Sequence, residues 1–137
     1  MKIKIARIIT RMDLGGAQQA VLYLSKRLDP ASFEQVIITG CGGLMLPELE
    51  QISFIRHYEI PELHRHIGPG GMWSDLKAIG RIRNILRLEK PHLVHTHTPK
   101  AGILGRWAAW GARIPVILHT YHGFGFSDFH GRLEREF

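Results

Sequence analysis

The sequence lacks what secreted and membrane-spanning proteins commonly contain. It has one cysteine, Cys41, in 137 residues, which excludes an internal disulfide. Its longest apolar runs have the length of a strand and are too short to cross a bilayer as a helix. Residues 1–7 interrupt their apolar side chains with charge, so they do not form the core of a secretory signal. These absences predict a cytoplasmic protein.

Two nucleotide-binding motifs are also missing. The chain contains no Gly-x-Gly-x-x-Gly fingerprint and no Walker A loop with its Lys-Ser/Thr pair. This excludes a nicotinamide dehydrogenase of the usual type and a P-loop nucleotidase. The composition, 45% hydrophobic and 22% charged, is ordinary for a globular protein, and the length predicts one domain over residues 1–137.

Positive charge is concentrated in one region. Residues 76–113 hold eight lysines and arginines against the single acid Glu89, while the formal net charge of the whole chain is +6. The predicted helix in this region exposes a basic patch, made of Lys77, Arg81, Arg83, Arg87 and Lys90. Such a patch could bind anionic lipid headgroups, nucleic acid or phosphorylated substrates. The alternative interpretation is a helix face that is only solvated and binds no partner. The region has no recognised nucleic-acid-binding motif, so nucleic acid is not an expected partner.

Apolar patterning predicts strands that alternate with helices. The expected strands are 3–10, 35–39, 53–58, 92–97 and 115–121. The expected helices are 17–28, a short turn at 47–51, 73–89, 99–112, and the first turns of another at 131–137. Leu76, Ile79, Ile82 and Leu86 mark the buried face of helix 73–89. The alternation predicts an α/β fold, a Rossmann-like doubly wound parallel sheet of about five strands in the order 3-2-1-4-5.

That strand order places a ligand crevice above the loops that follow Thr10 and His97, where the order reverses. Both loops have unusual residues. Gly15 and Gly16 open a helix, so a ligand can approach the backbone closely and the free amides favour a phosphate. At the second loop, Thr98 is a suitable N-cap and Pro99 suits the first helical position.

Histidines gather at the same expected edge. His95 and His97 leave one face of their strand and could hold a metal if Asp13 supplied a third ligand, but histidines hydrogen-bonded within the crevice wall are the preferred interpretation. After the next strand, His122 is the better candidate to touch a ligand, and His119 is expected to be structural. Phe124 and Phe126 either stack on a substrate or pack against the sheet.

These segments carry a resemblance over nearly the whole chain. Residues 13–17, 94–106 and 115–124 resemble, in order and spacing, the N-terminal domain of family 4 glycosyltransferases. Those enzymes are retaining, have the GT-B architecture of two Rossmann-like domains across a cleft, and use no metal, consistent with the lack of an Asp-x-Asp element here. The resemblance implies that Gly15 and Gly16 lie against the donor sugar and its phosphates, and that His122 contacts the donor sugar near the reacting centre.

The same resemblance implies the rest of the site and the partners. The acceptor side is expected at Asp13, His97, Thr98 and Lys100, with a glycan or lipid-linked sugar as acceptor and a nucleotide-diphosphate sugar as donor. The basic patch then faces the inner side of the cytoplasmic membrane. The C-terminal donor-binding domain of the family is not in this sequence, so the 137 residues are expected to be inactive alone, to bind a nucleotide sugar weakly or not at all, and to form a homo-oligomer through the exposed cleft face.

Two alternatives to a transferase half stay open at this point. Nucleotide-sugar 2-epimerases share the two-domain architecture, so half of such an enzyme is one alternative, although no local feature of the sequence favours it. The other alternative is a stand-alone acceptor-binding or regulatory module without catalysis.

Overall fold

The computed structural model describes residues 1–64 and 71–122, in which strands alternate with helices. The strands are β1 (Ile3–Ile9), β2 (Phe33–Thr39), β3 (Ile55–Glu59), β4 (Leu93–His97) and β5 (Val116–Thr120). The helices are α1 (Gly16–Arg27), α2 (Leu46–Glu50), α3 (Gly71–Glu89) and α4 (Pro99–Gly111). None of these helices, over the described residues, is long and apolar enough to cross a membrane.

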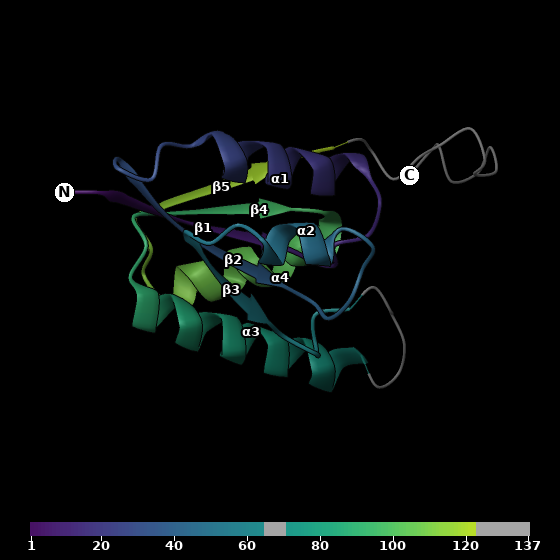
Figure 1. Cartoon of the computed structure of the whole chain (residues 1–137). Coiled ribbons are helices and arrows are strands. Elements are labelled where there is room, and N and C mark those ends of the chain that lie inside the picture. Colours follow the sequence, from purple (N-terminus) through teal and green to yellow (C-terminus); the bar gives the residue numbers. More distant parts are fainter. Residues whose placement is uncertain (65–70, 123–137) are drawn as a thin grey trace.

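The strands form one parallel sheet in the order β3-β2-β1-β4-β5, as the sequence predicts (Figure 1). β1 lies at the centre, in register with β2 over its full length and with β4 from Ile5 to Ile8. The order reverses between β1 and β4, so the carboxyl ends of these two strands define the crevice.

Two helices cover each face of the sheet, α3 and α4 on one face and α1 and α2 on the other (Figure 1). On one face, Ala6 and Ile8 of β1 pack with residues of α3 and α4 in a single buried cluster. On the other face, Ile9 packs against α1 and α2. Because successive strand residues point to opposite faces, this alternation assigns Arg7 to the α1 side, together with His95 and His97 of β4.

The end of α3 is fixed to the sheet by a buried carboxylate. Glu89 is 6% exposed and accepts a hydrogen bond of 2.6 Å from the hydroxyl of Tyr58. The same carboxylate forms ion pairs of 2.9 Å with Arg56 and 3.3 Å with Lys4. These contacts join α3 to β1 and β3, so the helix cannot slide along the sheet without breaking a satisfied buried charge.

The sequence-based interpretation of α3 was wrong at one position. Leu76 was expected on the buried face, but its side chain is 55% exposed and Ala78 takes the inward position, in line with Ile82 and Leu86. Ile79 is only half-buried. The helix expected at 131–137 and the aromatic residues Phe124 and Phe126 lie outside the described residues.

Candidate functional site

Two threonines join the strand ends that flank the crevice. Thr10 follows β1 and Thr98 follows β4, and their hydroxyl oxygens are 2.6 Å apart. The amide of Thr10 also lies 3.4 Å from the Thr98 hydroxyl oxygen. The loops that the sequence placed side by side are therefore in direct contact, although 88 residues separate the two threonines.

Thr98 occupies the N-cap position of α4, as the sequence predicted. Its side chain, however, makes no capping hydrogen bond to the helix. Its hydroxyl is already used, because it contacts Thr10 and donates to the carbonyl of His97. The backbone of Thr98 has φ 69° and ψ 151°, a conformation that costs a non-glycine residue about 1–3 kcal/mol. The first amides of α4 are therefore left without a side-chain cap, next to the crevice.

Gly15 and Gly16 form the start of α1, on the other side of the crevice. Gly15 is the N-cap, no side chain caps the helix, and its first turn contains no acidic residue. A Cβ placed on Gly16 would meet nothing within 4 Å, so this part of the backbone is open to a ligand. The buried side chain of Gln18 donates a 2.8 Å hydrogen bond to the carbonyl of Arg11 and holds the preceding loop. Open amides at a helix N-terminus favour an anion.

The loop after β2 supports this arrangement in a way that sequence reasoning missed. Gly43 has φ +115°, and a Cβ there would lie 2.2 Å from the carbonyl oxygen of Met12. The amide of Met45 donates to the same carbonyl at 2.8 Å. The absence of a side chain at Gly43 thus lets this loop pack against the crevice loop.

The histidines form a connected wall, as the preferred interpretation expected. His97 is 1% exposed, and its Nδ1 lies 2.8 Å from Nε2 of the exposed His122. The ring of His95 is tilted by 39° against the ring of His97 at a centroid distance of 4.1 Å, and its Nε2 lies 2.5 Å from the Thr120 hydroxyl oxygen. Asp13, the acid expected to complete a metal site with them, instead accepts a 2.8 Å bond from Nε of Arg11. His97 thus holds the ring of His122 at the mouth of the crevice.

His119 lies between β5 and α4, where a structural residue was predicted, and it also lines the cavity beside His122. Its Nδ1 lies 2.8 Å from the hydroxyl oxygen of Thr96, and its ring fills the space above Gly102 of α4. A Cβ on Gly102 would approach the ring to 2.4 Å, so only glycine permits this close contact between β5 and α4.

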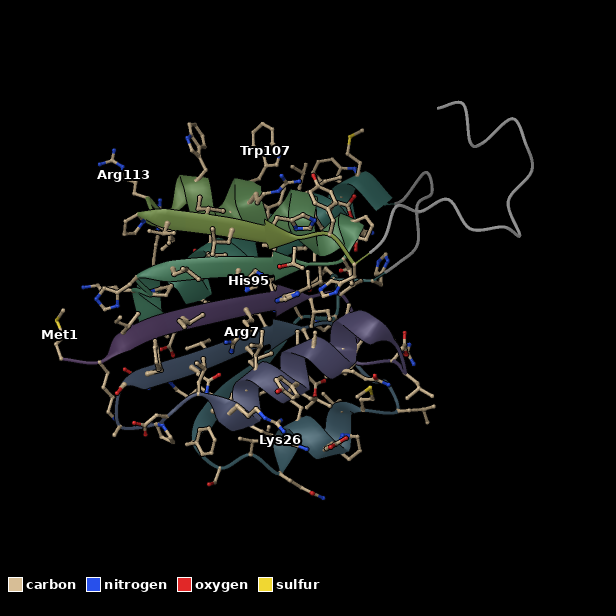
Figure 2. All side chains as sticks on the ribbon, turned by 90° about the horizontal axis from the view of Figure 1, so that it is seen from above. Met1, Arg7, Lys26, His95, Trp107 and Arg113 are labelled. Atoms are coloured by element: carbon tan, nitrogen blue, oxygen red, sulfur yellow. The ribbon has the colours of Figure 1, made fainter. Side chains whose placement is uncertain are left out.

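A buried cation lies beside these histidines. Arg7 is 3% exposed, and it lies next to His95 in the β1–β4 register (Figure 2). Its Nη1 donates to Gln35 at 2.6 Å, and no carboxylate among the described residues pairs with it. Burial lowers the pKa of Arg7 to about 10, so the guanidinium remains charged at neutral pH. Apolar patterning did not predict a buried arginine on the central strand β1.

Burial and this positive surrounding keep the neighbouring histidines neutral. Burial, with the nearby His95, His122 and Arg7, lowers the pKa of His97 to about 3. Burial also lowers the pKa of His95, with Arg7 as the next cause. At His95 and His97 the crevice wall therefore has neutral imidazoles beside one fixed positive charge, and this arrangement suits an anionic ligand better than a cation.

A cavity of about 380 Å³ opens beside His122. Its lining includes Thr98, Ile103, Arg106 and His122. A second hollow of about 490 Å³ lies on the outer surface of α4, where Ile103 and Arg106 meet Trp107 and Trp110. Since Ile103 and Arg106 line both, the two hollows are adjacent along α4. Sequence reasoning missed this surface because the outward residues of α4 continue an apolar pattern that resembles a buried face.

Lys100 and the basic patch, which the sequence also assigned to the site, lie farther from the crevice histidines. The Lys100 ammonium forms a 3.0 Å ion pair with Asp75 of α3, so it lies between the two helices at the crevice end. The basic patch lies on α3 and is exposed, although Arg81 is paired with Glu62 at 3.0 Å. Arg87 and Lys90 line a hollow at the opposite end of the molecule from the crevice, since α3 ends where β4 begins. The basic patch and the histidines therefore do not form one site.

Comparison with known proteins identifies a matching protein family. Residues 15–137 match the model of the glycosyl transferase 4-like domain. The chain is 35% identical over 127 residues to an Escherichia coli protein named UDP-Gal:alpha-D-GlcNAc-diphosphoundecaprenol alpha-1,3-galactosyltransferase, and the match covers 93% of this chain but 32% of that enzyme. The chain thus spans about a third of that relative's length.

Solved structures show the same fold at lower identity. MurG from Acinetobacter baumannii superposes with a TM-score of 0.70 at 20% identity, over 90% of this chain and 37% of that one. UDP-GlcNAc 2-epimerase from Neisseria meningitidis, bound to UDP-GlcNAc, superposes with a TM-score of 0.62 at 16% identity, over 89% of this chain and 33% of that one. The fold alone therefore does not separate a transferase from an epimerase, whereas the family model does.

Proposed function

This chain belongs to the glycosyl transferase 4-like domain family, and we propose that it forms the acceptor-binding half of an enzyme that transfers a sugar from a nucleotide-diphosphate sugar to a lipid-linked sugar. The observation that carries this proposal is the meeting of three features at one crevice. These are the open start of α1 at Gly16, the strained junction at Thr98, and His122 held by the buried His97.

The donor side is the edge between Gly15, Gly16 and His122. A diphosphate needs backbone amides and positive potential, and the uncapped start of α1 and the buried charge of Arg7 supply both. His122 contacts the donor sugar, and the 2.8 Å bond to His97 fixes the direction of its ring. The resemblance to family 4 glycosyltransferases implies transfer without a metal. Asp13, the acid nearest the crevice histidines in the sequence prediction, is paired with Arg11.

The acceptor side is the junction between β4 and α4. Thr98 and Lys100 border it, and Asp13 and His97 complete it from the neighbouring loop and strand end. The acceptor of the Escherichia coli relative is, by its name, a sugar linked through a diphosphate to undecaprenol. We infer an acceptor of the same class here, with its diphosphate near the uncapped amides of α4 and the ammonium of Lys100.

The outer face of α4 would meet the membrane that carries such a lipid. Ile103, Trp107 and Trp110 are 54%, 64% and 74% exposed, and Trp107 extends outward from α4 (Figure 2). Tryptophan side chains favour the membrane interface, and basic side chains favour anionic headgroups. Arg106 and the basic patch on the adjacent α3 supply that charge. We therefore propose that the α3–α4 layer lies on the cytoplasmic face of a membrane.

An NMR titration tests the acceptor assignment on the 137-residue chain itself. The probe is a water-soluble, short-chain prenyl diphosphate that carries N-acetylglucosamine. We expect amide shifts concentrated at residues 13–16 and 98–101. Lys100→Gln should weaken binding about tenfold, because a hydrogen bond to a charged group contributes about 1.5 kcal/mol or more.

The matched control is Lys77→Gln, which removes an exposed lysine on α3 and should leave the affinity unchanged. Shifts confined to other parts of the chain, or equal effects of the two substitutions, would contradict the acceptor assignment.

A further inference from the structure

Three metal-ligating side chains meet at the carboxyl end of β3, away from the crevice. Among the described residues, one ligand atom from each of Glu50, His57 and Glu59 lies within 4.8 Å of the other two. His57 and Glu59 are two residues apart on β3 and so point to the same face, which is the face that α2 covers. Glu50 is the last residue of α2. The cluster therefore joins a helix to the strand beneath it.

The ring of His57 is already oriented as metal-binding histidines are. The hydroxyl of Thr39 donates its only proton to the carbonyl of Gly40 at 2.8 Å. Its oxygen lies 2.8 Å from Nε2 of His57 and must therefore accept a proton from that nitrogen. This fixes the proton on Nε2 and leaves the Nδ1 lone pair free. A histidine that donates one N–H to an oxygen and keeps the other nitrogen free is the arrangement found around metal ligands.

The charges of the cluster also favour a cation. In the described part of the chain, neither Glu50 nor Glu59 forms an ion pair with a lysine or arginine. Two carboxylates thus lie close together beside the ring of His57 without a lysine or arginine paired to either.

We propose that Glu50, His57 and Glu59 bind a divalent transition metal of the zinc class and thereby join α2 to β3. Ligand atoms around tetrahedral zinc are about 3.4 Å apart, given bonds of about 2.0–2.2 Å. Closing the present separations requires movements of about 1 Å, which exposed glutamate side chains make by small rotations. The site lies three strand spacings from β4, roughly 14 Å, so it is a structural site rather than part of the transfer reaction.

Isothermal titration of the chain with Zn²⁺ tests this proposal. We expect one equivalent to bind, with a rise in Tm, and we expect no binding of Mg²⁺ at the same concentration because imidazole suits zinc better. His57→Gln and Glu59→Gln should each weaken binding by at least about tenfold, and Thr39→Val by about tenfold through the ring orientation. Glu48→Gln, on the same helix but paired with Lys26, is the matched control and should bind as the unsubstituted chain does.

Two outcomes overturn the proposal. One is zinc affinity that His57→Gln leaves unchanged. The other is loss of binding in His122→Gln with retention in His57→Gln, which would assign the zinc to the crevice histidines. Circular dichroism of each variant separates lost ligands from lost folding.

Discussion

Acidification should destabilise this domain through one buried ring. His97 is 1% exposed and packs between His95 and His122, and its surroundings lower its pKa to about 3. In the unfolded chain the same ring has a pKa near 6.5. The unfolded state therefore binds a proton that the folded state refuses between these two values. The contribution of His97 is complete above pH 6.5 and is lost as the pH falls toward 3.

The size of the effect follows from the two pKa values. Integrated over pH, the proton that only the unfolded state binds lowers the free energy of unfolding by about 2 kcal/mol between pH 7 and pH 5. The pKa values of His57, His95 and His119 are also lowered, chiefly by burial, so these rings add to the acid sensitivity in the same direction.

Urea unfolding at pH 7 and pH 5 measures this loss, and His97→Asn isolates the part due to His97. The substituted amide keeps a polar group near the position of Nδ1 but does not titrate. The variant should lose about 2 kcal/mol less than the unsubstituted chain over the same pH interval, whatever its stability at pH 7. An equal loss in both proteins would refute the reasoning, since His97 would then titrate normally in the folded state.

Two further predictions concern α4 and its junction. In flotation with anionic vesicles, Trp107→Ala and the charge reversal Arg83→Glu with Arg87→Glu should each reduce binding of the chain to the vesicles. The control Tyr23→Ala removes a similarly exposed aromatic side chain from α1, on the other face of the sheet, and should not reduce binding. Equal loss in all three variants would contradict a membrane role for the α3–α4 layer. Thr98→Gly should be more stable than Thr98→Ala by about 1 kcal/mol in urea unfolding, because both lose the hydroxyl but only glycine relieves the φ of 69°; the reverse order would show that the junction is not strained.

The order of the strands in the sheet was predictable from the apolar patterning of strands and helices together with the general rules for connecting parallel strands. Parallel strands separated by helices allow few arrangements, and right-handed crossovers select among them. The same logic brought Thr10 and Thr98 together, since each follows a strand on one side of the reversal in strand order. Leu76 was misplaced because periodicity alone does not reveal which apolar stripe of a helix is covered. Its outward position adds to the exposed apolar surface at the start of α3, with Met72 and Trp73.

The electrostatics of the site could not be predicted in the same way. Arg7 and His95 become neighbours only through the pairing of β1 with β4. His97 and His122 are 25 residues apart, and their bond depends on the register of β4 against β5. A one-residue shift in that register would change where β5 ends and so move His122 away from His97. The sequence therefore indicates which residue types gather at the crevice, while the register decides which of them touch.

On the proposed function, α4 is the element that would hold both parts of one acceptor. Its first residue follows the strained Thr98 at the crevice, Gly102 lies against His119, and Ile103 lines both hollows. Trp110 is twelve residues beyond Thr98, which is about 18 Å along a helix with a rise of 1.5 Å per residue. A sugar diphosphate at the start of α4 and an apolar chain on its outer turns would thus contact a single rigid helix. Such an acceptor would explain why α4 exposes Trp107 and Trp110 on its outer turns.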